Sequence, residues 1–125
     1  MCTILIVESS RVDSWTAQGA LSKALSLREI IFVFCQTIGS ATKVINSGLI
    51  LDGVLTDMTL SDGTGSDIIN LVRVSSTEIP IAAMGSTTPG ELPDNVPFFR
   101  KPVGDPDREI LLELWTKSVE ISCGY

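Results

Sequence analysis

Residues 51–57, LDGVLTD, place an aspartate at the end of an apolar run, and the glycine-rich segment 58–65, MTLSDGTG, follows directly. A short apolar run bounded by turn residues is typical of a strand buried in a parallel sheet. Ligands of open α/β sheets bind outside the carboxyl ends of the strands. The sequence therefore predicts a functional carboxylate, Asp57, at the edge of a sheet.

The composition favours one compact domain covering residues 1–125, because 44% of the 125 residues are hydrophobic and only 19% are charged. The formal net charge of −6 disfavours binding to phosphate backbones or anionic lipid, so we expect no nucleic-acid or membrane partner. No stretch approaches the roughly eighteen apolar residues of a membrane helix, and the first residues do not resemble a secretory signal. We therefore expect a cytoplasmic protein.

The three cysteines, Cys2, Cys35 and Cys123, are widely spaced, and the chain has no histidine. This pattern offers no zinc site or Cys–His pair and predicts reduced thiols in a cytosolic protein. The lack of histidine also removes the commonest general base, so we do not expect an enzyme that uses acid–base or Ser–His chemistry.

Apolar and β-branched runs alternate with helical patterns along the whole chain. The runs predict strands at residues 3–7, 29–35, 49–56, 79–84 and 98–99. The helical patterns lie at residues 12–25, 39–45, 66–74 and 106–122. Strict alternation of this kind indicates a parallel sheet with helices on both faces.

Three details of these elements can be tested against a structure. Ser9 or Ser10 is expected to cap the first helix, whose apolar face would contain Val12, Trp15, Leu21 and Leu25. Asp105 or Asp107 is expected near the start of the last helix, and Gly48 suits the end of the second. Residues 86–97 include Pro89, Gly90, Pro93 and Pro97, so we expect a loop there in place of a helix.

Five landmarks in one order resemble the receiver domain of two-component response regulators over essentially the whole chain. They are Glu8 after the first strand, Asp57 after the third, LSDGTG at 60–65, Met84-Gly85-Ser86, and Phe98-Phe99-Arg100-Lys101-Pro102. The resemblance implies a flavodoxin-like, doubly wound sheet of five parallel strands in the order 2-1-3-4-5. Here the family's fourth helix would be replaced by the proline-rich loop.

The resemblance also implies roles for individual residues. Asp57 would accept a phosphoryl group from a sensor histidine kinase, a phosphotransfer protein or a small phosphodonor. Lys101, held rigid by Pro102, would contact the phosphoryl oxygens as a compact positive charge. Glu8, Asp57 and the backbone carbonyl of Thr59 would hold Mg²⁺.

Several positions depart from the family pattern. Ser9 stands where a second acidic metal ligand is usual, so we expect weak Mg²⁺ binding. The switch hydroxyl falls on Gly85, and Ser86 would replace it only with a shifted backbone; Phe98 matches the aromatic residue that rotates in the family. Loss of the fourth helix removes much of a surface used for dimers and targets, although a homodimer stays possible.

Three hypotheses remain open from the sequence. The first is a phosphorylation-accepting receiver with weakened Mg²⁺-dependent chemistry. The second is a degenerate receiver that acts as a phosphorylation-independent protein-interaction module. The third is a flavodoxin-like binding protein that uses residues 61–65, SDGTG, as a phosphate cradle, although this segment lacks the lysine of a P-loop.

Overall fold

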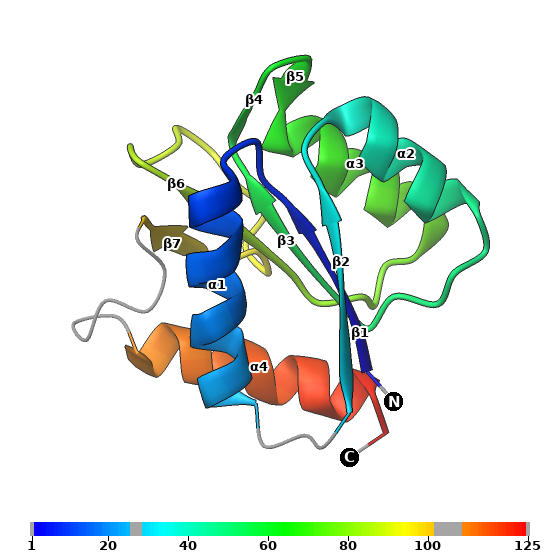
Figure 1. Ribbon diagram of the computed structural model, residues 1–125, viewed down its shortest axis with the longest axis vertical. Helices are drawn as coiled ribbons and strands as arrows, with labels where there is room; N and C mark the ends of the chain where they lie inside the picture. The colour runs from blue at the N-terminus through cyan, green and yellow to red at the C-terminus, as the bar shows by residue number, and fades with distance from the viewer. Residues whose placement is uncertain (1, 26–28, 102–108, 125) are drawn as a thin grey trace.

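A five-stranded parallel sheet forms the centre of the computed structural model, which describes residues 2–25, 29–101 and 109–124 (Figure 1). Its strands are β1 (Cys2–Val7), β2 (Ile30–Cys35), β3 (Gly53–Asp57), β6 (Ile81–Gly85) and β7 (Phe98–Arg100), in the order β2-β1-β3-β6-β7. A small hairpin of β4 (Thr59–Leu60) and β5 (Gly63–Thr64) follows β3. Without this hairpin, the order is the predicted 2-1-3-4-5, so the expected fold class is confirmed.

Four helices cover the two faces of the sheet (Figure 1). They are α1 (Arg11–Ala24), α2 (Ile38–Asn46), α3 (Gly65–Ser75) and α4 (Glu109–Ser122). Helices α1 and α4 contribute to one apolar core, and α2 and α3 to the other. Residues 86–97 contain no helix, so the predicted loop between β6 and β7 is confirmed. Pro102, Asp105 and Asp107 lie outside the described residues.

Strand β3 is buried along its whole length and holds the two cores together. Its side chains alternate between them, since Leu55 packs on the α1/α4 side and Val54 on the α2/α3 side. Gly53 lets α4 approach closely, because a Cβ there would lie 3.0 Å from Val119 Cγ2. The buried strand thereby fixes the position of Asp57 at its carboxyl end.

The predicted apolar face of the first helix is wrong at two positions. Val12 and Trp15 are 69% and 63% exposed, and the buried face of α1 contains Ser14, Ala17 and Leu21. These three residues follow the spacing of one helical stripe, while Val12 and Trp15 lie on the opposite side. Because the residues at positions 14 and 17 are small, a search for large apolar side chains does not detect this buried stripe.

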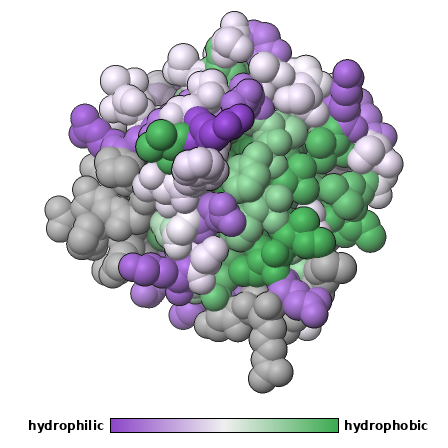
Figure 2. All heavy atoms as spheres, viewed as in Figure 1, coloured by the Kyte–Doolittle hydropathy of each residue, from purple (hydrophilic) through white to green (hydrophobic). Residues whose placement is uncertain are grey.

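The third strand is shorter than predicted, because it starts at Gly53 and the apolar residues Leu49 and Ile50 are exposed. The second strand is at the edge of the sheet, which leaves Ile31 and Phe34 exposed where full burial was expected. Figure 2 shows apolar surface gathered over β2 and beside it. Apolar runs alone do not distinguish an edge strand from a central one.

The cysteine prediction is wrong for two of the three thiols. Cys2, at the start of β1, forms a disulfide with Cys123, beyond the end of α4, and their Cα atoms are 5.3 Å apart. The start of β1 and the end of α4 lie side by side in Figure 1, which sequence separation does not reveal. Cys35 is a buried free thiol, and burial raises its pKa. None of the helices described is long and apolar enough to cross a membrane.

Candidate functional site

Two carboxylates meet at the carboxyl edge of the sheet because β1 and β3 are parallel neighbours. Val7 pairs with Thr56, so Glu8 and Asp57 leave their strands side by side. Glu8 is held in place by its own N–H, which donates to the carbonyl of Cys35 over 2.9 Å. Glu8 is only 1% exposed and Asp57 only 4%. Two buried negative charges at this edge require a nearby cation.

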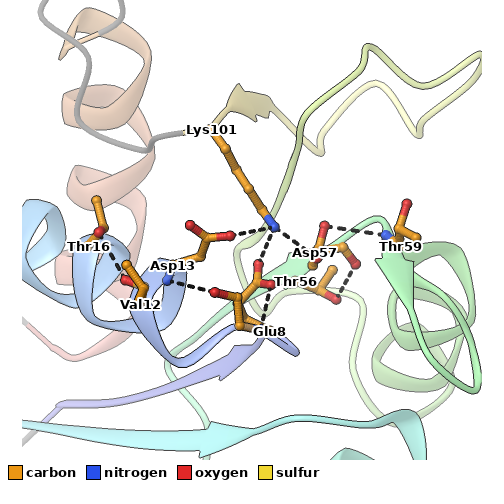
Figure 3. A network of polar contacts seen from close by, with 9 residues as sticks. Glu8, Val12, Asp13, Thr16, Thr56, Asp57, Thr59 and Lys101 are labelled. Carbon is orange, nitrogen blue, oxygen red and sulfur yellow. Dashed lines mark hydrogen bonds and ion pairs between the residues drawn. The ribbon is translucent and has the colours of Figure 1, made fainter.

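Lys101 supplies that cation from the end of β7. Its backbone N–H donates to the carbonyl of Gly85 over 3.0 Å, which anchors the residue beyond the last strand. Its Nζ lies 2.6 Å from Glu8 Oε2 and 2.9 Å from Asp57 Oδ2 (Figure 3). The structure therefore brings together the three charged residues that the sequence singled out.

A third carboxylate, Asp13, belongs to the same cluster and was missed in the sequence. Its Oδ2 lies 3.3 Å from Lys101 Nζ (Figure 3). Asp13 is in the first turn of α1, and side chains on a helix tilt toward its N-terminus. The carboxylate of Asp13 therefore points back toward the edge of the sheet, although Asp13 lies four positions after Ser9 in the sequence. An acidic residue in the first turn after Glu8-Ser9-Ser10 was the available signal.

The cluster carries an excess of negative charge, since three carboxylates and one ammonium sum to −2. Burial raises the pKa of Glu8, an effect that Lys101 and the N–H of Ser10 partly oppose. Burial lowers the pKa of Lys101, but its ion pairs with Glu8 and Asp57 outweigh this effect and raise the pKa to about 12. The ammonium is therefore charged at neutral pH, and the cluster favours further positive charge.

The two serines after β1 have different positions. Ser10 is the N-cap of α1, and its Oγ accepts a hydrogen bond from the N–H of Asp13. Ser10 N–H also donates to Glu8 Oε1 over 3.1 Å. Ser9 is exposed and lines the cavity beside the cluster. Helix capping is therefore assigned to Ser10, and Ser9 brings no charge to the site.

A cavity of about 610 Å³ opens onto the cluster. Its walls include Glu8, Asp13, Asp57 and Lys101, together with residues of the β3–α3 and β6–β7 connections. Thr59 is one of the lining residues, and its N–H donates to Asp57 Oδ1 over 3.3 Å. Both oxygens of Asp57 therefore have a donor, while the cavity leaves space for a small anion or ion beside them.

Gly65 allows the connection after Asp57 to fold back on itself. A Cβ at this position would lie 2.5 Å from the carbonyl oxygen of Asp57 and 2.9 Å from Met58 Sδ. Gly65 N–H also donates to the carbonyl of Met58 over 3.0 Å. The close approach of two backbone segments thus requires glycine here.

We expect Gly65→Ala to lower the free energy of unfolding by about 1–3 kcal/mol, because the methyl group must displace backbone. Urea denaturation of both proteins would measure this difference. Gly90→Ala is the control, since a Cβ at Gly90 meets no atom within 4 Å. Equal loss of stability in the two variants would contradict this account of the turn.

Of the three predicted switch positions, Gly85 and Ser86 lie at and just after the end of β6, and Phe98 begins the neighbouring strand β7. A Cβ on Gly85 would lie 3.3 Å from Cε2 and 3.4 Å from Cζ of Phe98, so the aromatic ring occupies the space beside Gly85. Phe98 is half-buried, and Ser86 is exposed and lines the cavity. The ring of Phe98 therefore covers Gly85, the position at which the resemblance to receiver domains predicted a switch.

The glycine-rich segment has a structural role that weighs against a phosphate cradle. Asp62 accepts hydrogen bonds from the N–H groups of Ile38 and Gly39, over 2.9 and 3.0 Å. These bonds lower the pKa of Asp62 and place its negative charge at the N-terminus of α2. The side chain of Asp62 thus joins this segment to α2, and its negative charge disfavours a phosphate bound beside it.

Comparison with solved structures shows the fold of response regulator receiver domains. A response regulator receiver protein from Sinorhizobium medicae WSM419 matches with a TM-score of 0.76 and 17% identity, over 97% of this chain and 96% of that one. The N-terminal domain of a response regulator/sensory box/GGDEF 3-domain protein from Carboxydothermus hydrogenoformans matches with a TM-score of 0.73 and 20% identity, over 97% of this chain and 98% of that one. The Mn²⁺-bound form of response regulator Rcp1 matches with a TM-score of 0.70 and 17% identity, over 90% of each chain. No protein-family model matches the sequence, and no curated protein matches it either.

Proposed function

We propose, from this receiver fold, that the chain is a signalling module of a two-component system that accepts a phosphoryl group on Asp57. The observation that carries the proposal is the contact of Lys101 Nζ with Asp57 Oδ2 and Glu8 Oε2 beside an open cavity. A strand-end aspartate without such partners would be an ordinary turn residue. A fixed ammonium at the same carboxylate is suited to stabilise the negative charge on the oxygens of a phosphoryl group in transfer.

In the proposed reaction, an oxygen of Asp57 forms a bond to phosphorus while the bond from phosphorus to the donor breaks. The leaving group keeps the electron pair of the broken bond, and the product is an aspartyl phosphate. Lys101 then follows the transferred charge and pairs with phosphoryl oxygens. The N–H of Thr59, which donates to Asp57 Oδ1, holds the carboxylate in one orientation.

A divalent ion fits the residues present, because carboxylate oxygens are the ligands that Mg²⁺ prefers and the cluster has an excess charge of −2. Glu8, Asp57 and the carbonyl of Thr59 would hold the ion. When bound, it would neutralise charge on the phosphoryl group. Ser9 supplies no carboxylate, so we propose weaker Mg²⁺ binding than in a receiver with an acidic residue there.

The proposed protein partner is a sensor histidine kinase or a phosphotransfer protein, and a small phosphodonor is the other proposed source of the phosphoryl group. The chain would act in the cytoplasm as a signalling module and not as an enzyme with a small-molecule product. Exposed apolar residues of β2, Ile31 and Phe34, offer a surface on which a homodimer could form.

The second candidate is a phosphorylation-independent interaction module. It is favoured by the contact between Phe98 and Gly85, because no hydroxyl at Gly85 follows the phosphoryl group and the ring already fills the adjacent space. In this case Asp57, Glu8 and Lys101 would stabilise the fold and transmit no signal.

Beryllofluoride, a mimic of the phosphoryl group, separates the two candidates when it is added with Mg²⁺ and monitored by NMR. A receiver that accepts phosphate should show shifted amide resonances around Asp57 and Lys101, and Asp57→Asn should show none. Unchanged spectra of the folded protein at saturating Mg²⁺ would rule out the phosphoryl-accepting function and leave the interaction module.

A further inference from the structure

Asp13 has no role in the proposed function so far, although it reaches the same ammonium as Glu8 and Asp57. Its Oδ2 makes the longest of the three contacts with Lys101 Nζ, and its side chain is 38% exposed while that of Glu8 is 1% exposed. Asp13 therefore lies on the outer, water-facing side of the cluster. Ser9 and Asp13 line the same cavity, so a carboxylate on either residue would add negative charge to a metal site there.

Glu8 depends on a nearby cation, because its carboxylate is buried. Among the described residues, the close partner of its buried Oε2 is the ammonium of Lys101. The ion pair with Lys101 Nζ, 2.6 Å away, is the contact that balances its charge. When Lys101 turns to a phosphoryl group, Oε2 keeps a buried charge without a partner, which is unfavourable unless another cation takes the place of the ammonium.

We propose that Asp13 replaces the missing acid of position 9 and helps Glu8 and Asp57 to hold a divalent cation. Asp13 does so by accepting hydrogen bonds from water bound to the ion. Mg²⁺ and Mn²⁺ keep several waters when they bind proteins, so an outer carboxylate can act without touching the ion. In the structure described, Lys101 Nζ stands among the three carboxylates and supplies their positive charge.

The helix explains why a residue in the first turn can compensate for one before the helix. Ser10 caps α1, and Asp13 follows in the first turn, with its N–H bound to the Ser10 hydroxyl. Its side chain tilts toward the N-terminus of the helix and so toward the sheet edge. The proposal thus moves a charge of the metal site from the β1–α1 connection onto the helix, beside the cavity that both Ser9 and Asp13 line.

The test is Mn²⁺ binding, measured as free Mn²⁺ by electron paramagnetic resonance. The wild-type chain should bind one Mn²⁺, and Asp13→Asn should bind it about 10- to 100-fold more weakly, as is typical when a carboxylate around a metal site is lost. Asparagine preserves the size and the backbone N–H of Asp13, and circular dichroism would verify the fold. Ser9→Asp in the Asp13→Asn background should restore the affinity.

Glu91→Gln is the matched control, because it removes a negative charge from the same cavity without touching the cluster around Lys101. Glu91 is exposed and lines the same cavity, but it makes no ion pair with Lys101. Because salt screens exposed charges, this variant should bind Mn²⁺ within about twofold of wild type. Equal losses in Glu91→Gln and Asp13→Asn, or no Mn²⁺ binding by wild type, would overturn the role of Asp13.

The inference rests on the proposed function but can fail separately from it. If Asp57 accepts phosphate while Asp13→Asn retains the wild-type Mn²⁺ affinity, the role of Asp13 is wrong and the proposed function stands. If Mn²⁺ binding depends on Asp13 while Asp57 accepts no phosphate, the function is wrong and the metal site stands.

Discussion

Replacing Lys101 with methionine is expected to lower the free energy of unfolding by about 3–5 kcal/mol at neutral pH, the usual result of removing one partner of a buried ion pair. Methionine is an unbranched side chain one heavy atom shorter than lysine, and it leaves three carboxylates without their cation. Glu8 suffers most, because it is 1% exposed and its Oε2 relies on Lys101 alone among the described residues.

Urea denaturation of wild type, Lys101→Met and the control Lys117→Met would measure this effect. Lys117 is exposed on α4, so its replacement should change stability by less than about 1 kcal/mol. Mg²⁺ should stabilise Lys101→Met more than wild type, because the ion can enter the place of the ammonium. A Lys101→Met variant as stable as Lys117→Met would contradict the description of the cluster.

The pH dependence of this difference has a definite sign. A carboxyl group whose pKa is raised by folding favours the folded state at low pH and opposes it as the pH rises through that pKa. The pKa of Glu8 is raised, so the deficit of Lys101→Met should shrink when the pH is lowered from neutral toward 5. At the alkaline end, the wild-type advantage should disappear as Lys101 loses its proton near pH 12.

Cys123→Ser is expected to lower the free energy of unfolding by about 4–5 kcal/mol, as loop-closure entropy predicts for a disulfide that closes more than about 100 residues. The bond joins Cys2 to Cys123, which are 121 positions apart. Thermal denaturation with and without reductant would measure the effect. Reductant should lower the melting temperature of wild type and leave that of Cys123→Ser unchanged.

Counting thiols in the unfolded protein under non-reducing conditions tests the same bond without a stability measurement. One reactive thiol, that of Cys35, is expected, because the other two cysteines are joined. The disulfide would be contradicted if the wild-type protein had three reactive thiols and a melting temperature that reductant did not change.

The sequence predicted the sheet because its buried strands are strongly marked. The runs that became β1 and β3 are buried at every residue, and such strands read as continuous apolar segments. The prolines and Gly90 between β6 and β7 excluded a helix for reasons that are local to the backbone. The alternation of strands and helices then indicated a parallel sheet with helices on both faces, and the resemblance to receiver domains implied the strand order.

The features that escaped prediction depend on contacts between distant residues. Asp13 lies 88 positions from Lys101, and nothing near Asp13 in the sequence indicates that the two meet. The pairing of Cys2 with Cys123 depends equally on where the two chain ends come together. On α1, small buried residues such as Ala17 carry little signal beside the exposed Trp15. The local sequence pattern therefore predicts helices and strands, whereas contacts between residues at the ends of these elements depend on the whole fold.

The most direct test of the proposed function is the intact mass of the protein after incubation with acetyl phosphate and Mg²⁺. We expect wild type to gain the mass of one phosphoryl group, with the acid and base lability of an aspartyl phosphate, and Asp57→Asn to gain none. An unmodified wild-type protein, folded and at high Mg²⁺, would contradict the claim that the cluster of Glu8, Asp57 and Lys101 is a site of phosphoryl transfer.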